Sequence, residues 1–110
     1  MEDFIDRLEL YSQSNHEIAA DLGRRFHDYR VALRLTQKDV SEATGLSVMT
    51  LVRFENGSAD SLRLGGFLAL LRAIQRLENI VGVIPDVPFS LYETNRREAP
   101  TRVRRRKNEK

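Results

Sequence analysis

The sequence contains no cysteine, and its only two histidines, His16 and His27, stand apart from each other. Disulfides and thiol chemistry are therefore excluded, and no spacing typical of a metal site occurs. The chain also lacks a nucleophile with a neighbouring base and a phosphate-binding glycine loop. We expect no cofactor, no metal and no enzymatic activity.

Long hydrophobic runs are missing as well. No stretch approaches the roughly twenty apolar residues that span a membrane. The first residues, Met1, Glu2 and Asp3, do not have the basic and then apolar pattern of a secretory signal. We expect a cytoplasmic protein without a membrane partner.

Positive charge is scarce in most of the chain and concentrated at its end. Residues 1–95 hold 10 Lys and Arg against 14 Asp and Glu, a net charge of −4, whereas residues 96–110 hold 8 against 2, a net charge of +6. A run such as RVRRRK at residues 102–107 buries too little apolar surface to offset the entropy of ordering it. The basic end is therefore predicted to be an arm outside the folded core.

Helical spacing of apolar residues dominates the chain before Pro85, and no segment alternates apolar and polar residues as a strand does. The fold is predicted to be all-α. We expect an amphipathic helix in residues 1–13, a helical domain in residues 14–84 and an extended basic tail in residues 85–110.

The N-terminal part is predicted to form two helices. The first is short and acidic and occupies residues 3–12. A capping-box sequence at Ser14 then starts a second helix, which is expected to run to about Arg34. The apolar face consists of Phe4, Ile5, Leu8 and Tyr11 in the first helix and of Ile18, Leu22, Phe26, Tyr29 and Leu33 in the second.

Two short helices are expected to flank a tight turn in the middle of the chain. Thr36 opens the first helix, and Gly45 ends it because glycine adopts a left-handed conformation at little cost. Ser47 caps the second helix, which ends at the Asn-Gly of residues 56–57. The expected core positions are Val40 and Ala43 in the first helix and Leu51 and Phe54 in the second.

Apolar residues are plentiful between Leu64 and Ile84, before Pro85 and Pro88 end the helical pattern. The surplus from Phe67 to Ile84 favours a homodimer interface. The alternative is that the N-terminal helix covers the same surface within one chain. The apolar positions are Leu64, Phe67, Leu70, Leu71, Ile74, Leu77, Ile80, Val81 and Ile84.

The stretch from Leu35 to Gly57, LTQKDVSEATGLSVMTLVRFENG, opens with Thr-Gln, has a glycine at the turn and closes with Phe-Glu-Asn-Gly. In these features it resembles the lambda-repressor-like, or XRE, helix-turn-helix family. The resemblance covers residues 22–80 and implies a five-helix domain that binds double-stranded DNA. Members usually bind a palindromic operator as dimers. The matching residues are Thr36, Gln37, Val40, Ala43, Gly45, Leu46, Ser47, Leu51, Phe54, Glu55, Asn56 and Gly57.

The resemblance also implies a recognition helix whose outer face meets the bases. Because Leu51 and Phe54 point inward, helical geometry directs the remaining residues toward the other face. Spacing alone leaves burial and exposure of the three apolar ones equally open, and the family alignment turns them outward. There they would touch thymine methyl groups, and the arginine would pair with guanine, contact a phosphate or stay solvated. The outer residues are Val48, Met49, Val52 and Arg53.

Other positions are implied to meet the DNA backbone. Gln37 would bond a phosphate at a helix start, Arg63 would approach the minor groove or a phosphate, and Ser47 and Asn56 would add contacts. The alternatives are ordinary helix-start chemistry for Gln37, a solvated loop arginine for Arg63 and a purely local role for Ser47 and Asn56. Arg30 and Glu55 match positions that form a buried ion pair in several family members. Further positive charge, moderated by Asp28, Asp39 and Glu42, comes from Arg24, Arg25, Arg34 and Lys38.

The segment after Ile84 and the arginine-rich end resemble the C-terminus of HipB-like antitoxins, regulators encoded beside HipA-type kinases. This resemblance implies an autoregulating antitoxin that binds a HipA-like kinase toxin, with Phe89, Leu91 and Tyr92 as partner-binding residues. A stand-alone or phage repressor and a tail that adds only non-specific DNA affinity remain open. So does a protein-interaction module that keeps the fold without operator binding.

Overall fold

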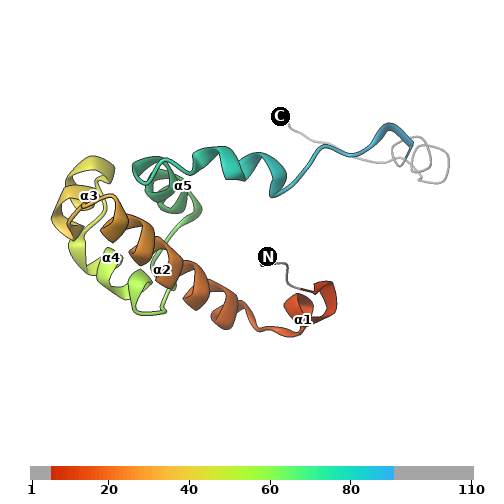
Figure 1. Cartoon of the computed structure of the whole chain (residues 1–110), viewed down its shortest axis with the longest axis horizontal. Helices are drawn as coiled ribbons and strands as arrows, with labels where there is room; N and C mark the ends of the chain where they lie inside the picture. The colour runs from red at the N-terminus through yellow and green to blue at the C-terminus, as the bar shows by residue number, and fades with distance from the viewer. Residues whose placement is uncertain (1–5, 91–110) are drawn as a thin grey trace, which may run out of the picture. The chain divides into compact units, whose positions relative to one another are not determined.

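A computed structural model describes residues 6–90 of the chain, and these residues form helices joined by loops, without a strand (Figure 1). The prediction of an all-α fold is confirmed. None of the described helices is long and apolar enough to cross a membrane. Contacts divide the chain into two units, the first ending at Glu78 and the second beginning at Asn79. The elements are α1 (Arg7–Ser12), α2 (Asn15–Ala32), α3 (Gln37–Thr44), α4 (Val48–Glu55), α5 (Leu64–Ala73) and the 3₁₀-helix η1 (Leu77–Gly82).

Helices α2 and α3 begin at capping boxes, as their sequences predict. Ser14 Oγ accepts a hydrogen bond from the Glu17 amide at 3.0 Å, and the Ser14 amide donates to the Glu17 carboxylate at 2.8 Å. Thr36 and Asp39 make the same pair of bonds, both at 2.9 Å. Each box gives a hydrogen-bond acceptor to two backbone N–H groups at the start of a helix, which would otherwise lack a partner.

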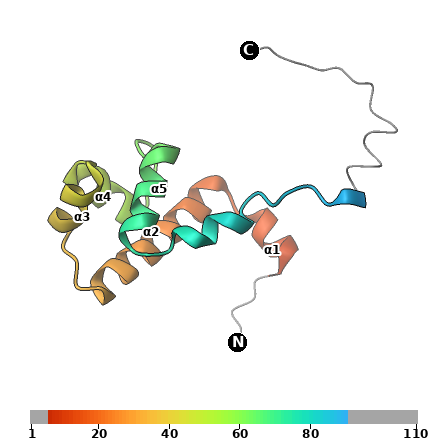
Figure 2. The ribbon, with the colours of Figure 1, turned by 90° about the horizontal axis from the view of Figure 1, so that it is seen from above.

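The core of the first unit lies where α2, α3, α4 and α5 meet. Helix α4 packs against α2 and α3, and α5 packs against α3. Figure 2 shows these helices grouped at one end of α2, with α1 beside the other end. The Phe54 ring lies 5.7 Å from that of Phe26 and 6.2 Å from that of Phe67, measured between centroids. The buried apolar residues are Phe26, Val40, Leu51, Phe54, Leu70 and Ile74.

A glycine allows α2 and α4 to approach each other closely. Gly23 is buried in α2, and a Cβ atom built on it would lie 1.9 Å from the carbonyl oxygen of Phe54. No side chain fits at that distance, so the end of α4 contacts the backbone of α2 directly. This contact places the last turn of α4 against the longest helix of the unit.

One core position of the predicted helices was wrong. Ala43 is exposed, and Leu46, after the turn, packs against the core. Leu64, at the first turn of α5, is 71% exposed. Helix α2 ends at Ala32, close to its predicted end at about Arg34.

The predicted N-terminal helix does not bury its apolar face in the part that the structure describes. Leu8 and Tyr11 are 79% and 73% exposed, and Phe4 and Ile5 lie outside the described residues. The Arg7 guanidinium stacks on the Tyr11 ring at 5.0 Å from its centroid. Leu8 and Tyr11 therefore do not cover an apolar surface of the domain.

Candidate nucleic-acid interface

The turn between α3 and α4 is fastened by side-chain hydrogen bonds. Gly45 adopts φ of 82°, a left-handed conformation that ends α3. Ser41 Oγ donates to the carbonyl oxygen of Leu46 at 2.6 Å. Thr44 Oγ1 donates to the carbonyl oxygen of Val40 at 2.7 Å and accepts from the Leu46 amide at 3.2 Å. These bonds fix the direction in which α4 leaves the turn, and the sequence reasoning did not foresee them.

Helix α4 is held by one face. Ser47 Oγ accepts a hydrogen bond from the Thr50 amide at 3.0 Å and so caps its first turn. Leu51 and Phe54 are fully buried, as expected. With its start capped and one side in the core, α4 has little freedom to rotate or shift.

The opposite face of α4 is open to solvent. Val48 and Met49 are 41% and 52% exposed, Arg53 is exposed, and Val52 is half-buried. The structure thus places the residues whose burial the spacing left open on the outside, wholly or in part. An outward patch of this kind presents apolar surface beside one guanidinium, the two chemistries that contact thymine methyl groups and guanine edges in a major groove.

Arg30 and Glu55 form an ion pair that joins α2 to the end of α4. Arg30 Nε and Nη2 donate to the two Glu55 carboxylate oxygens at 2.6 and 2.9 Å, and Arg30 Nη1 donates to the carbonyl oxygen of Leu35 at 2.8 Å. Only 11% of the Arg30 side chain and 4% of the Glu55 side chain are exposed. The hydrogen bond to Glu55 raises the pKa of Arg30 above its usual value. The pair is largely buried and bidentate.

Gln37 belongs to the same network. Its Nε2 donates to Glu55 Oε1 at 3.1 Å, so the side chain that was expected to bond a phosphate is held by an acceptor within the protein. The amide nitrogen keeps a second N–H. Gln37 thus links the first turn of α3 to the last residue of α4, and the arrangement leaves one donor for an outside group.

Two hollows adjoin this network, of about 400 and 490 Å³. The smaller one brings Asn56, exposed at the end of α4, together with Gln37. His27 also lines this hollow. The sequence did not identify it as a candidate because it belongs to no recognisable motif. The smaller hollow is lined by Arg24, His27, Arg30, Gln37, Glu55 and Asn56, and the larger by Arg30, Val31, Arg34, Leu35, Thr36 and Gln37.

Only some of the cations that were expected to add positive charge here are free to do so. Arg24 pairs with Asp21 and, at 3.6 Å, with Asp28, and Arg25 pairs with Asp21 at 2.8 Å. Their charge is largely neutralised locally. The cations that form no ion pair within residues 6–90 include Arg34, Lys38, Arg53 and Arg63.

The remaining candidate residues belong to other parts of the chain. Arg63 is the exposed N-cap residue of α5, where its side chain makes no capping bond. Phe89 belongs to the second unit and is 75% exposed. Leu91 and Tyr92 lie outside the described residues.

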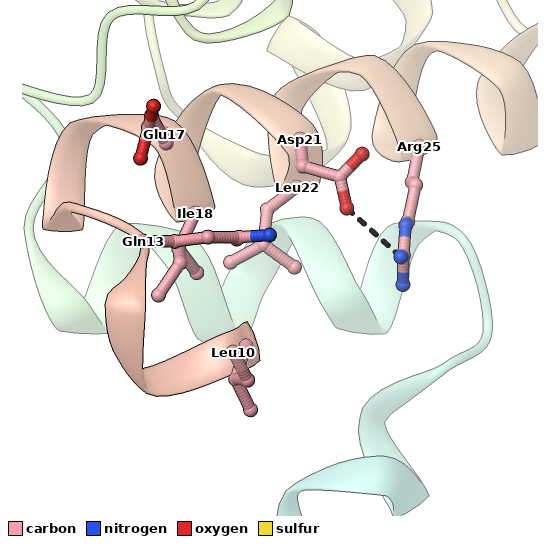
Figure 3. A pocket seen from close by; sticks show the side chains of 7 residues that line it. All are labelled: Leu10, Gln13, Glu17, Ile18, Asp21, Leu22 and Arg25. Carbon is pink, nitrogen blue, oxygen red and sulfur yellow. Dashed lines mark ion pairs between the residues drawn. The ribbon is translucent and has the colours of Figure 1, made fainter. Parts of the chain in front are cut away.

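A larger hollow, of about 680 Å³, lies between α1 and the first half of α2 (Figure 3). Its apolar floor includes Leu10 and Ile18, but its charged groups already have partners. Glu17 is occupied in the capping box of α2, and Arg25 is paired with Asp21. With its charges used in this way, the hollow is a weaker candidate than the open face of α4.

No group of three or more His, Cys, Asp or Glu residues suited to a metal ion occurs in the described part of the chain.

Comparison with known proteins identifies the family. Neither the curated proteins nor the solved structures contain a match to this sequence. The family described as "Helix-turn-helix domain" matches residues 21–79, the segment that contains α3, the turn and α4. The chain therefore belongs to the helix-turn-helix domain family, whose members are DNA-binding regulators.

Proposed function

We propose that this protein is a sequence-specific transcriptional repressor that places α4 in the major groove of DNA. The proposal rests on the two faces of α4, of which Leu51 and Phe54 form the buried one and Val48 and Met49 the exposed one. Packing within residues 6–90 leaves 41% of Val48 and 52% of Met49 exposed. The major groove offers complementary thymine methyl groups, and its width admits a helix.

Each side chain has a proposed task in this complex. Arg53 donates two hydrogen bonds to O6 and N7 of a guanine, while Val48, Met49 and Val52 touch thymine methyl groups. Ser47, Asn56 and Arg63 contact the sugar-phosphate backbone and set the register of the helix on the duplex. The second N–H of Gln37 bonds a phosphate, with Arg30 and Glu55 holding the amide in place.

We also propose that the protein binds a palindromic operator as a homodimer. One domain makes few base contacts, and a two-fold pair doubles them over two half-sites about 34–36 Å apart. Of the apolar residues from Phe67 to Ile84, those at the end of the range remain exposed, with Val81 at 76% and Ile84 at 85%, while Leu70 and Ile74 are buried in the core. Light scattering at micromolar concentration is the direct check, and a stable monomer there would exclude the dimer.

A partner protein is the second proposal, in the form of a HipA-like kinase toxin for which this chain is the antitoxin. The exposure of Val87 and Phe89, at 52% and 75%, supports it, since apolar anchors of this kind contribute most to binding when a partner buries them. Co-expression with a kinase encoded beside the gene tests it. Co-purification that survives in Phe89→Ala and in a chain shortened before residue 85 would exclude this segment as the contact.

The DNA-binding proposal is tested with Arg53→Ala. A duplex selected from a random pool serves as the operator, and its scrambled form serves as the reference. We expect the variant to lose about 5- to 150-fold of the preference for the selected duplex, which corresponds to about 1–3 kcal/mol for a bidentate base contact. Arg72→Ala is the matched control, because Arg72 is an exposed arginine on α5 without an ion pair in residues 6–90.

Two results would contradict the proposal. Failure of the wild-type protein to enrich any duplex would exclude sequence-specific binding, and an unchanged preference in Arg53→Ala would remove that residue from base contact. Salt separates DNA binding from the protein-interaction alternative. Phosphate contacts weaken steeply as salt rises, whereas an apolar protein interface on Val48 and Met49 does not.

A further inference from the structure

The turn between α2 and α3 contains an arginine in a backbone conformation that favours glycine. Arg34 has φ of 61°, and its amide donates to the carbonyl oxygen of Val31 at 2.9 Å, while the Leu35 amide donates to that of Arg30 at 3.0 Å. Glycine is the residue that adopts such a conformation at the end of a helix at least cost. An arginine here is strained, and its surroundings show whether the side chain has a task that accounts for the strain.

The surroundings of Arg34 indicate the task. Arg34 and Gln37 line the same hollow of about 490 Å³. The other arginine of that hollow, Arg30, has its guanidinium occupied by Glu55 and by the carbonyl oxygen of Leu35. Arg34 is exposed and forms no ion pair with any carboxylate of residues 6–90. The hollow thus combines a free guanidinium with the amide that keeps one N–H unused, and both groups favour an anion.

The ion pairs of α2 distinguish Arg34 from Arg24 and Arg25. Arg24 pairs with Asp21 and Asp28, and Arg25 pairs with Asp21, so neighbouring carboxylates offset part of their attraction for a phosphate. Arg34 lies beyond the end of α2, where no acidic residue precedes it by three or four positions. It therefore keeps its full charge beside the start of α3.

We propose that Arg34 is a DNA-contacting residue that binds a backbone phosphate beside the one bonded by Gln37. This inference rests on the proposed function and adds a contact to it. The contact is to phosphate and not to a base, so it raises affinity for every sequence alike. A long cationic side chain at this turn requires the left-handed backbone conformation, which glycine would adopt with less strain.

A second residue of the chain supplies a matched control. Gln75 follows α5 with φ of 62°, the same strained conformation at the same place relative to a helix end, and it is exposed and uncharged. Gln75→Gly and Arg34→Gly therefore relieve the same backbone strain. Only the second removes a charge from the proposed interface.

The experiment compares full-length wild type, R34G, R34Q, R34K and Q75G on a mixed-sequence duplex of about 30 base pairs over a range of salt concentrations. We expect R34G and R34Q to bind more weakly and to flatten the slope of log affinity against log salt by about 0.9, the value for one phosphate contact. The ratio of wild-type to variant affinity for the duplex should then shrink about threefold between roughly 50 and 200 mM salt. R34K should retain the wild-type slope, and Q75G should match wild type throughout.

The same variants separate DNA contact from a local role. Arg34 also stands near the negative end of the α2 dipole, and if that were its only task, R34Q would lower the melting temperature without changing the salt slope. That outcome, or a wild-type slope in both R34G and R34Q, would overturn the inference while leaving the proposed function intact. Unchanged preference for the selected over the scrambled duplex is expected in all variants. If wild type itself shows no salt-dependent binding, the proposed function fails and this inference fails with it.

Discussion

Helices α3 and α4 are alike in their construction and differ on the side that faces away from the core. Each has eight residues and a hydroxyl side chain as its N-cap, Thr36 for α3 and Ser47 for α4. The outer side of α3 is charged, with Lys38 and Glu42 exposed, whereas that of α4 exposes Val48 and Met49. Folding requires only the inner faces to be apolar, so the difference between the outer faces is explained by what each helix contacts.

The two helices also differ in how firmly they are held. Helix α3 buries one large side chain, Val40, while α4 buries Leu51 and Phe54 and has its last residue, Glu55, fixed by Arg30. A helix that must place side chains against base edges needs this restraint, because a small displacement would misalign every contact. A helix that touches only phosphates tolerates more freedom.

Removing one buried side chain from each helix in turn should have the largest effect, and it tests whether α4 is held more firmly than α3. Phe54→Ala should lower the free energy of unfolding by about 3–5 kcal/mol, because it deletes a buried ring that contacts Phe26 and Phe67. Val40→Ala removes fewer atoms and should cost less. Urea denaturation of both variants measures the two values, and an equal or larger loss for Val40→Ala would show that α3 is the better-anchored helix.

Breaking the ion pair at the end of α4 should destabilise the fold almost as much. Glu55→Gln leaves the Arg30 guanidinium buried without its counter-charge, and we expect a loss of about 3 kcal/mol in the free energy of unfolding. Replacing both residues by methionine should cost much less than either single change, because no charge then stays buried. Additive losses in the double variant would mean that the two residues stabilise the fold independently.

Much of this construction follows from sequence alone. The capping boxes at Ser14 and Thr36, the helix end at Gly45 and the inward positions Leu51 and Phe54 depend on local chemistry and helical period, which neighbouring residues determine. The burial of Ala43 was predicted wrongly because helical spacing assigns a residue to a face but does not say how much of that face the other helices cover. Leu46 takes that place in the core from beyond the turn.

The site was less accessible to sequence reasoning. The outward position of Val48 and Met49 depends on which face of α4 the other helices cover, and that is a tertiary property. The bond from Gln37 to Glu55 joins residues 18 positions apart, and no local pattern encodes it. The pairing of Arg24 and Arg25 with Asp21 was visible as a helical spacing of three and four residues, but the sequence reasoning did not use it.

Substitutions on the outer face of α4 should have a smaller effect, and they test whether this face and not that of α3 contacts bases. Replacing Val48 and Met49 by serine should leave the melting temperature within a few degrees of wild type, because both side chains are already exposed. Binding to the selected duplex should weaken by about 1.5–3 kcal/mol, the range for burial of one such apolar side chain, while binding to a scrambled duplex stays unchanged. The same pair of measurements on Glu42→Ser in α3 is the control, and loss of preference in that variant would move base contact to α3.

The smallest effect concerns the two N-caps and is a dependence on pH. The Thr36 amide and hydroxyl hydrogen-bond with Asp39 and hold the pKa of its carboxyl below the ordinary value of 3.8. A lowered folded-state pKa means that the charge of Asp39 stabilises the fold above its unfolded pKa and stops doing so as pH falls through the folded one. Asp39→Asn mimics the protonated acid, so the stability gap between this variant and wild type should be full at neutral pH and should narrow as pH falls below the unfolded pKa of 3.8. Ser47→Ala removes the cap of α4, which contains no titrating group, and its gap from wild type should stay constant over the same range, as urea denaturation at each pH would show. A gap for Asp39→Asn that does not change with pH would mean that the charge of Asp39 contributes nothing to the start of α3, and the caps of the two helices would then be equivalent.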